Sequence, residues 1–138
     1  HLIILAGVGG ELALSTIERL VKQFPNLTLE FIVCPLRHQF NLRRSLDAKG
    51  LSLVDEQLIQ EDKWFYEIIH LTTAPGDEIV DVGSKLWRGA NVFHLDYVGK
   101  VLGHYLRMSK EPTCNVDYEI LRYQQLRQRL EHLVLARN

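Results

Sequence analysis

The segment LIILAGVGGEL at residues 2–12 constrains the fold of this chain more than any other stretch. The apolar run Leu2–Ala6 is followed by three glycines within four positions, Gly7, Gly9 and Gly10, and then by a helical pattern. Continuous apolar runs of this kind are typical of strands buried on both faces of a parallel sheet. The segment therefore predicts a buried strand, a tight glycine bend and a helix, which is how an α/β unit begins.

The order strand then helix repeats through residue 50. Apolar residues recur at helical spacing over Glu11–Gln23, a second apolar run spans residues 29–34 before Pro35, and residues 37–50 form another helical pattern. The side chains expected to face inward from this second helix are those of Phe40, Leu42 and Leu46. Two strand–helix units in succession predict parallel strands joined by right-handed crossovers.

The pattern changes after residue 50. Residues 51–62 and 63–74 read as two strands that meet at a polar turn near Glu61–Lys63, which predicts an antiparallel hairpin. Helical stretches are then expected at residues 79–87, 94–110 and 116–136. We therefore predict an α/β fold whose parallel strands end in an antiparallel hairpin, with a boundary between residues 1–76 and a helical extension at 77–138.

Composition excludes several classes of protein. The formal net charge of −1 gives no whole-chain attraction for nucleic acid, so an RNA partner has to be met by a local patch. The only two cysteines, Cys34 and Cys114, lie far apart, which excludes a disulfide scaffold or a cysteine zinc site and fits a reducing cytoplasm. The six histidines show no metal-ligand spacing, so we expect no metal. No run approaches the about 18 apolar residues of a membrane span.

The glycine bend has three possible uses. A dinucleotide loop of the form G-x-G-x-x-G needs a small residue at the position of Leu12, so NAD or FAD binding is disfavoured. A plain turn needs only one residue with positive φ, and one glycine suffices for it. The third use is a platform of bare backbone at the carboxyl edge of the sheet, against which a flat base or a cofactor tail can lie. The plain turn and the backbone platform both stay open as uses of the glycine bend.

The segments IILAGVGGEL, VCPLRHQFNLRRSLDAKG and DEQLIQEDKWFYEIIHLTTAPG occur in this order. Together they resemble the second half of the bacterial tRNA adenine-N1 methyltransferases that modify position 22 of tRNA. That family has an AGMGG stretch after a strand, a Pro-containing segment followed by an LR helix, and a hairpin with an acidic turn and an aromatic-Tyr-Glu run. The matching residues beyond the glycines are Pro35, Leu42, Arg43, Glu61, Asp62, Phe65, Tyr66 and Glu67.

The resemblance implies that residues 1–76 are the C-terminal half of a Rossmann-like methyltransferase sheet. It implies S-adenosylmethionine as cofactor, tRNA as partner, and transfer of a methyl group to N1 of an adenine. The residues implied are Ala6, Gly7 and Val8 for the cofactor, Gly7, Gly9 and Gly10 for catalysis, and Pro35, Arg37, His38 and Tyr66 for the substrate. Adenine N1 is already nucleophilic, so such a site mainly has to position two reactants and an unstacked base.

Each side chain also has a structural alternative. His38 is placed to cap a helix or face solvent, and Tyr66 to cover the sheet. Glu67 reads as a residue of the polar face, and Arg37, Arg43 and Arg44 as a basic helix edge that is either solvated or in contact with phosphate. These alternatives stay open.

The sequence also departs from the pattern of this family. The family binds its cofactor mainly through a first half, with a glycine-rich loop after one strand and an acid after the next, and neither motif is present here. We therefore expect the chain alone to be inactive and to form a homodimer or depend on a missing N-terminal half. The alternative is a non-enzymatic α/β interaction module whose helical tail binds a protein partner.

Overall fold

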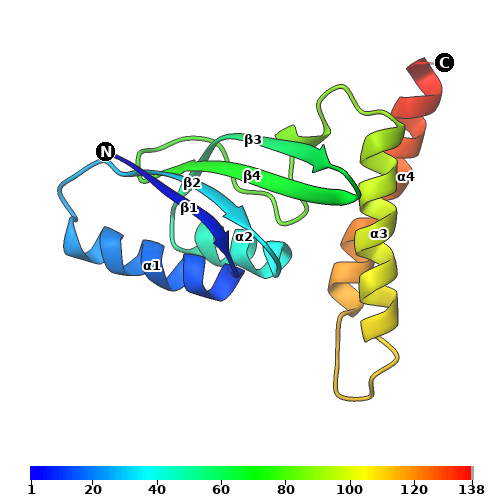
Figure 1. The fold of residues 1–138 in the computed structure, drawn as a ribbon, viewed down its shortest axis with the longest axis horizontal. Helices are drawn as coiled ribbons and strands as arrows, with labels where there is room; N and C mark the ends of the chain where they lie inside the picture. The colour runs from blue at the N-terminus through cyan, green and yellow to red at the C-terminus, as the bar shows by residue number, and fades with distance from the viewer. Residues whose placement is uncertain (138) are drawn as a thin grey trace. The chain divides into compact units, whose positions relative to one another are not determined.

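In the computed structural model of the chain, four strands form one mixed sheet in the amino-terminal part (Figure 1). They are β1 (Leu2–Val8), β2 (Glu30–Pro35), β3 (Ser52–Glu61) and β4 (Trp64–Thr72), in the spatial order β1-β2-β4-β3. β1 pairs with β2 in parallel, whereas β4 is antiparallel to both β2 and β3. The predicted parallel pair and antiparallel hairpin are confirmed.

Two helices pack against one face of this sheet. They are α1 (Gly10–Gln23) and α2 (Gln39–Ala48), which lie on the same side of the strands in Figure 1. The side chains predicted to face inward from α2 are all buried, and the hydrophobic core also includes Ala13, Ile17, Phe31, Val33, Ile69 and Leu71. Burial of this apolar area is the main force that holds the strand–helix units together.

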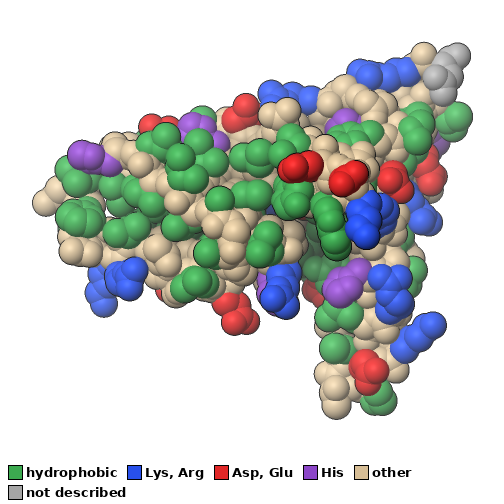
Figure 2. Space-filling model, viewed as in Figure 1, with side chains coloured by type: hydrophobic (Ala, Val, Ile, Leu, Met, Phe, Trp, Pro, Cys, Tyr) green, Lys and Arg blue, Asp and Glu red, His purple; other side chains and the backbone are tan. Residues whose placement is uncertain are grey.

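The first strand is not buried on both faces, and that prediction is wrong. Leu2 and Ile4 are 55% and 65% exposed, because β1 is an edge strand and no helix in residues 1–86 covers its second face. The register places Ile4 beside Ile32 and Ile32 beside His70, so these side chains share that face. We call it the open face; its apolar members include Leu2, Ile4, Ala6, Ile32, Cys34, Ile59, Trp64, Tyr66 and Ile68. Figure 2 shows hydrophobic side chains gathered over the strands.

The segment after β4, residues 73–86, is a strap that returns along the sheet. Only a short 3₁₀ turn, η1 (Lys85–Trp87), forms where a longer helix was predicted. Gly83 has a φ of +87°, which a helix does not allow, and backbone groups of the strap form hydrogen bonds with residues outside it. The Leu53 N–H donates to the Asp77 carbonyl at 2.8 Å. The compact unit consequently runs from His1 to Leu86, and the boundary expected after residue 76 falls inside the strap.

A second compact unit begins at Trp87 and consists of α3 (Val92–Met108) and α4 (Asp117–Arg137); the structure describes the chain through residue 137. Both helices were predicted within two residues of these ends. The rings of Tyr105 and Tyr123 stack between them with centroids 5.7 Å apart. Over residues 1–137, no helix combines the length and apolar character needed to cross a membrane.

Candidate functional site

The glycine bend begins with a β-bulge. Ala6 pairs with Cys34 and Val8 pairs with Pro35, so Gly7 is an extra residue in β1 that has no partner position in β2. Its φ of +72° lies in the left-handed region that glycine adopts without steric cost. Bulges of this kind redirect a strand and are frequent beside active sites. Gly7 is exposed, and a Cβ atom there would meet no other atom within 4 Å.

Gly9 is the N-cap of α1 and also has open space around its Cα atom, although its backbone conformation, unlike that of Gly7, does not favour glycine. Its φ of −70° and ψ of 159° are accessible to any residue, and a Cβ atom there would also meet nothing within 4 Å. Neither the backbone conformation nor the packing of the described residues therefore requires glycine at this position. The bend presents bare backbone at Gly7 and Gly9.

Gly10 is a packing residue. A Cβ atom there would lie 3.1 Å from the carbonyl oxygens of both Arg37 and His38. Its N–H donates to the Arg37 carbonyl at 3.2 Å, and the Leu36 N–H donates to the Val8 carbonyl at 3.0 Å. The bare backbone expected over residues 6–10 is therefore open only as far as Gly9, because Gly10 joins the loops that follow β1 and β2.

The loop after β2 brings two of the predicted substrate residues to this edge. Arg37 and His38 are exposed, and their carbonyls contact Gly10 as described above. His38 is the N-cap of α2 with φ of +64°, a left-handed conformation that costs free energy for a residue with a side chain and is frequent at functional sites. Pro35, in contrast, is fully buried, so its ring is not accessible from this surface.

Tyr66 reaches the same edge from β4. Its side chain is half-buried and points to the open face, as do those of Ala6 and Cys34. The last pair between β2 and β4 is Val33 with Ile69, so Tyr66 lies beyond the paired part of β2.

Burial, with a smaller contribution from Glu67, raises the pKa of the Cys34 thiol and keeps it protonated.

Beneath this edge lies a buried charge network that the sequence analysis missed. The Arg43 guanidinium on α2 donates to Glu56 Oε2 at 2.6 Å and to Glu67 Oε1 at 2.9 and 3.1 Å. All three side chains are at most 3% exposed. The predictions of a solvated edge for Arg43 and a polar face for Glu67 are therefore wrong. Arg43 lies three residues from both Phe40 and Leu46, and this helical spacing could have placed it on the inward face.

The same network holds the strap. Glu56 Oε1 accepts the backbone N–H groups of Ser84, Lys85 and Leu86 at 2.6, 2.7 and 3.3 Å. Burial by itself would raise the pKa of Glu56, but the Arg43 guanidinium and these N–H groups outweigh it, so that its pKa is lowered. Burial likewise disfavours the charged Arg43, yet the Glu67 and Glu56 carboxylates raise the pKa of its guanidinium.

We expect a measurable acid sensitivity from Glu56. Because its pKa in the folded chain lies below the ordinary 4.5, its ionisation contributes stability fully above pH 4.5 and loses it as the pH falls through the lowered value. Glu56→Gln should lower the free energy of unfolding by about 1–3 kcal/mol at pH 7 and flatten its decline below pH 4.5. Urea unfolding at several pH values measures both effects. An acid decline of equal steepness in the variant would contradict this role.

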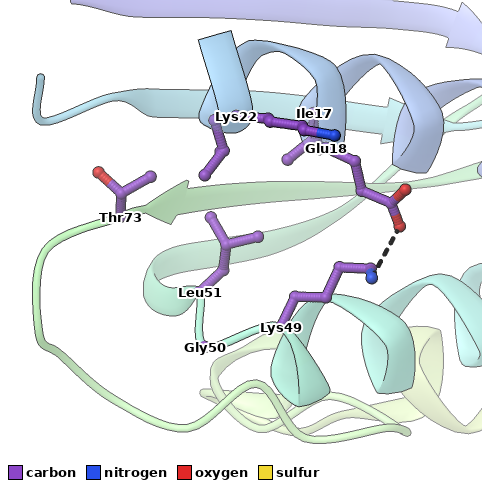
Figure 3. Close-up of a pocket in the computed structure, with 8 residues that line it drawn as sticks. Ile17, Glu18, Lys22, Lys49, Gly50, Leu51 and Thr73 are labelled. Carbon is purple, nitrogen blue, oxygen red and sulfur yellow. Dashed lines mark ion pairs between the residues drawn. The ribbon is translucent and has the colours of Figure 1, made fainter. Parts of the chain in front are cut away.

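A larger pocket of about 450 Å³ lies at the opposite, amino-terminal edge of the sheet (Figure 3). Its lining residues come from α1, from the turn between α2 and β3, and from Thr73 after β4. The Lys49 Nζ lies 3.2 Å from Glu18 Oε1 at this pocket. None of the predicted site residues lines this pocket. A small hollow of about 120 Å³ instead adjoins the glycine bend and is lined by Gly10 and His38 among others.

Leu12 does not obstruct the glycine bend in the way that the sequence predicted. Leu12 was expected to obstruct a close contact between helix and sheet, but its side chain is 58% exposed. The close approach occurs at Gly10 instead, between the first residue of α1 and the loop before α2. Among residues 1–137, no group of three or more His, Cys, Asp or Glu side chains is placed to hold a metal ion.

A sheet with parallel strands, a glycine bend at its carboxyl edge and a terminal antiparallel hairpin defines a Rossmann-like α/β domain. The family model described as a methyltransferase domain matches residues 1–69. The chain therefore belongs to the methyltransferase domain family. No curated protein matches the sequence.

Solved structures share the fold at low sequence identity. The B. subtilis m1A22 tRNA methyltransferase TrmK is 19% identical with a TM-score of 0.60, over 96% of this chain and 62% of that one. A protein of the NADB-Rossmann superfamily from Streptococcus agalactiae is 16% identical with a TM-score of 0.65, over 96% and 59%. The M. capricolum TrmK in complex with S-adenosyl-homocysteine is 17% identical with a TM-score of 0.58, over 96% and 58%. The chain thus spans about three fifths of the length of these proteins.

Proposed function

We propose that this chain supplies the substrate side of an S-adenosylmethionine-dependent methyltransferase that methylates N1 of an adenine in tRNA, in the cytoplasm. The observation that carries the proposal is the open glycine bend at the carboxyl edge of a methyltransferase domain. The similar structures, among them tRNA methyltransferases with a bound cofactor product, support the choice of substrate and cofactor. The alternative of a non-enzymatic interaction module is not favoured, because the methyltransferase model covers residues 1–69.

The residues of the bend fit a cofactor that presents a flat or extended surface. Gly7 and Gly9 leave free space where any other residue would place a Cβ atom, so a ligand can approach the backbone directly. When bound, S-adenosylmethionine supplies an electrophilic methyl group. In the proposed site Ala6, Gly7 and Val8 lie against this donor, and Gly9 leaves room for the adenine ring.

Adenine N1 carries an in-plane lone pair, so the chain's residues have to orient the base rather than remove a proton. Holding two reactants in near-attack geometry can contribute about 7–11 kcal/mol toward the barrier. Arg37 and His38 are exposed on the loop beside the bend, and Tyr66 lies on the open face at the same edge. We assign to these three side chains the contacts that hold the unstacked base and its phosphates.

The open face and the outer edge of β1 support a further part of this proposal. The strands of a parallel sheet are normally covered on both faces, whereas β1 is an edge strand with one neighbour and exposes Leu2 and Ile4. We propose that a further polypeptide segment pairs with β1, covers the open face and completes the cofactor site. A second copy of this chain is the alternative occupant, and light scattering distinguishes a monomer from a homodimer.

Labelled S-adenosylmethionine and bulk tRNA test the function. A protein that contains this chain together with a segment completing the sheet is expected to produce N1-methyladenosine, identified by nucleoside analysis. The 138-residue chain alone is expected to transfer no methyl group and to show no micromolar binding of S-adenosylmethionine by calorimetry. Methylation of another nucleoside would contradict the proposed substrate, and tight binding to the 138-residue chain would contradict the shared cofactor site.

A further inference from the structure

The β3–β4 hairpin extends well past the edge that carries the proposed site. After the last pair between β2 and β4, five more cross-strand pairs follow, from Gln57 with Ile68 to Glu61 with Trp64. We call residues 57–68 the arm. Trp64 lies three residues beyond the position level with Pro35, so the arm reaches about 10 Å past the end of β2.

The arm carries an aromatic strip on one face. Tyr66 is directly opposite Ile59, and Trp64 follows Tyr66 on the same face because alternate residues of a strand share a side. The Trp64 side chain is 60% exposed, although it is among the largest apolar groups in the chain. The strip is continuous with the open face that ends at Ala6 and the glycine bend.

Charged groups surround the exposed ring. The Lys63 Nζ lies 5.3 Å from the centroid of the Trp64 ring, and Glu61 is the cross-strand neighbour of Trp64. Asp62 occupies the turn with φ of +60°. The ring lies on the face that continues to the edge where we place the target adenine, so an RNA base is the group that the proposed site brings to it. The two carboxylates repel phosphate, which leaves the flat face of a base as the complementary group.

The proposed reaction creates a need for such a group. An adenine that leaves its stack removes a stacking partner from the adjacent nucleotide, and proteins that bind unstacked RNA replace it with aromatic side chains. We propose that Trp64 stacks on an RNA base next to the target adenine and thereby holds the unstacked conformation. This inference rests on the proposed function and adds a nucleic-acid contact at Trp64, a residue not among those assigned to the site above.

Tryptophan fluorescence tests the stacking directly. The chain has two tryptophans, so the difference in emission between the unmodified chain and Trp64→Phe is the signal of Trp64. The other tryptophan, Trp87, is only 6% exposed. Adding unmodified tRNA to the 138-residue chain should quench this part of the emission. Trp64→Ala should weaken tRNA binding by about 5- to 100-fold, while Trp64→Phe retains most of the affinity. The salt dependence of binding should be unchanged in Trp64→Ala, because no ionic contact is removed.

The matched control is Phe24→Ala, which removes an exposed aromatic ring after α1, at the other edge of the sheet. It should leave tRNA binding unchanged, and thermal unfolding should show that both alanine variants are folded. Full affinity in Trp64→Ala, or quenching of Trp87 alone, would overturn the stacking inference and leave the proposed function standing. A 138-residue chain that binds no tRNA at all would also overturn the stacking inference, whereas the proposed function is decided by the methylation assay on the completed protein.

Discussion

Arg43→Met is expected to lower the free energy of unfolding of this chain by about 3–5 kcal/mol. The guanidinium neutralises Glu56 and Glu67 in a region where all three side chains are at most 3% exposed. Methionine has a similar length but no charge, so two carboxylates would stay buried without their cation. Urea unfolding monitored by circular dichroism measures the loss. The effect should extend to the strap, because Glu56 also holds the backbone of residues 84–86.

Arg44→Met is the matched control for this prediction. Arg44 is the next residue on α2, is exposed, and has its guanidinium 5.8 Å from the centroid of the Phe40 ring. Its replacement should change the stability by no more than about 0.5 kcal/mol. Adding Glu67→Leu to Arg43→Met should recover part of the loss, because one of the two buried carboxylates is then removed. Equal losses for Arg43→Met and Arg44→Met would show that the network contributes little.

Gly9→Asn is expected to reduce kcat/KM for methyl transfer by about 100-fold or more without destabilising the fold. Gly9 has an ordinary φ and open space at its Cβ position, and asparagine is a favourable N-cap for α1. The new side chain would instead occupy the surface on which we place the adenine ring. Initial rates with labelled S-adenosylmethionine and tRNA, in a protein that also contains the segment completing the sheet, measure the loss of activity. Thermal unfolding measures the stability separately.

The neighbouring glycines provide the contrast. Gly7→Ala should cost about 1–2 kcal/mol of stability because of its left-handed φ, and Gly10→Ala about 1–3 kcal/mol because a Cβ atom there would press on two carbonyl oxygens. In Gly9→Asn only the methyl-transfer activity should fall, while the stability stays unchanged. An active and stable Gly9→Asn protein would mean that no substrate lies on the bend, and the proposed site would have to be abandoned.

The regular elements could be predicted because their signals are local. Apolar runs and helical spacing indicated β1, α1, β2 and α2, and the polar turn at Glu61–Lys63 indicated the hairpin. The helix expected at residues 79–87 failed for a tertiary reason, since several of its backbone N–H groups bind the side chains of Glu56 and Asp47 instead of helical carbonyls. The sequence contains no local mark of that competition.

The candidate site was predictable in part. The glycine bend, Arg37, His38 and Tyr66 do gather at the carboxyl edge, because successive parallel strands bring their following loops to one side of a sheet. Pro35 has its ring in the core, and the exposed ring at Trp64 was not singled out. Whether a residue at a strand end faces the core or solvent depends on strand register, which sequence alone specifies weakly.

The sequence by itself determined the order of strands and helices, the position of the bend and the resemblance to methyltransferases, since these follow from local spacing and motif order. Only the tertiary structure decided why each glycine is there: Gly7 for its φ, Gly10 for close packing, and Gly9 for neither. It also decided that Arg43 is buried between two carboxylates and that β1 has an open face. These properties depend on which distant segments pack together, and packing distances between distant segments are not written in the local pattern of residues.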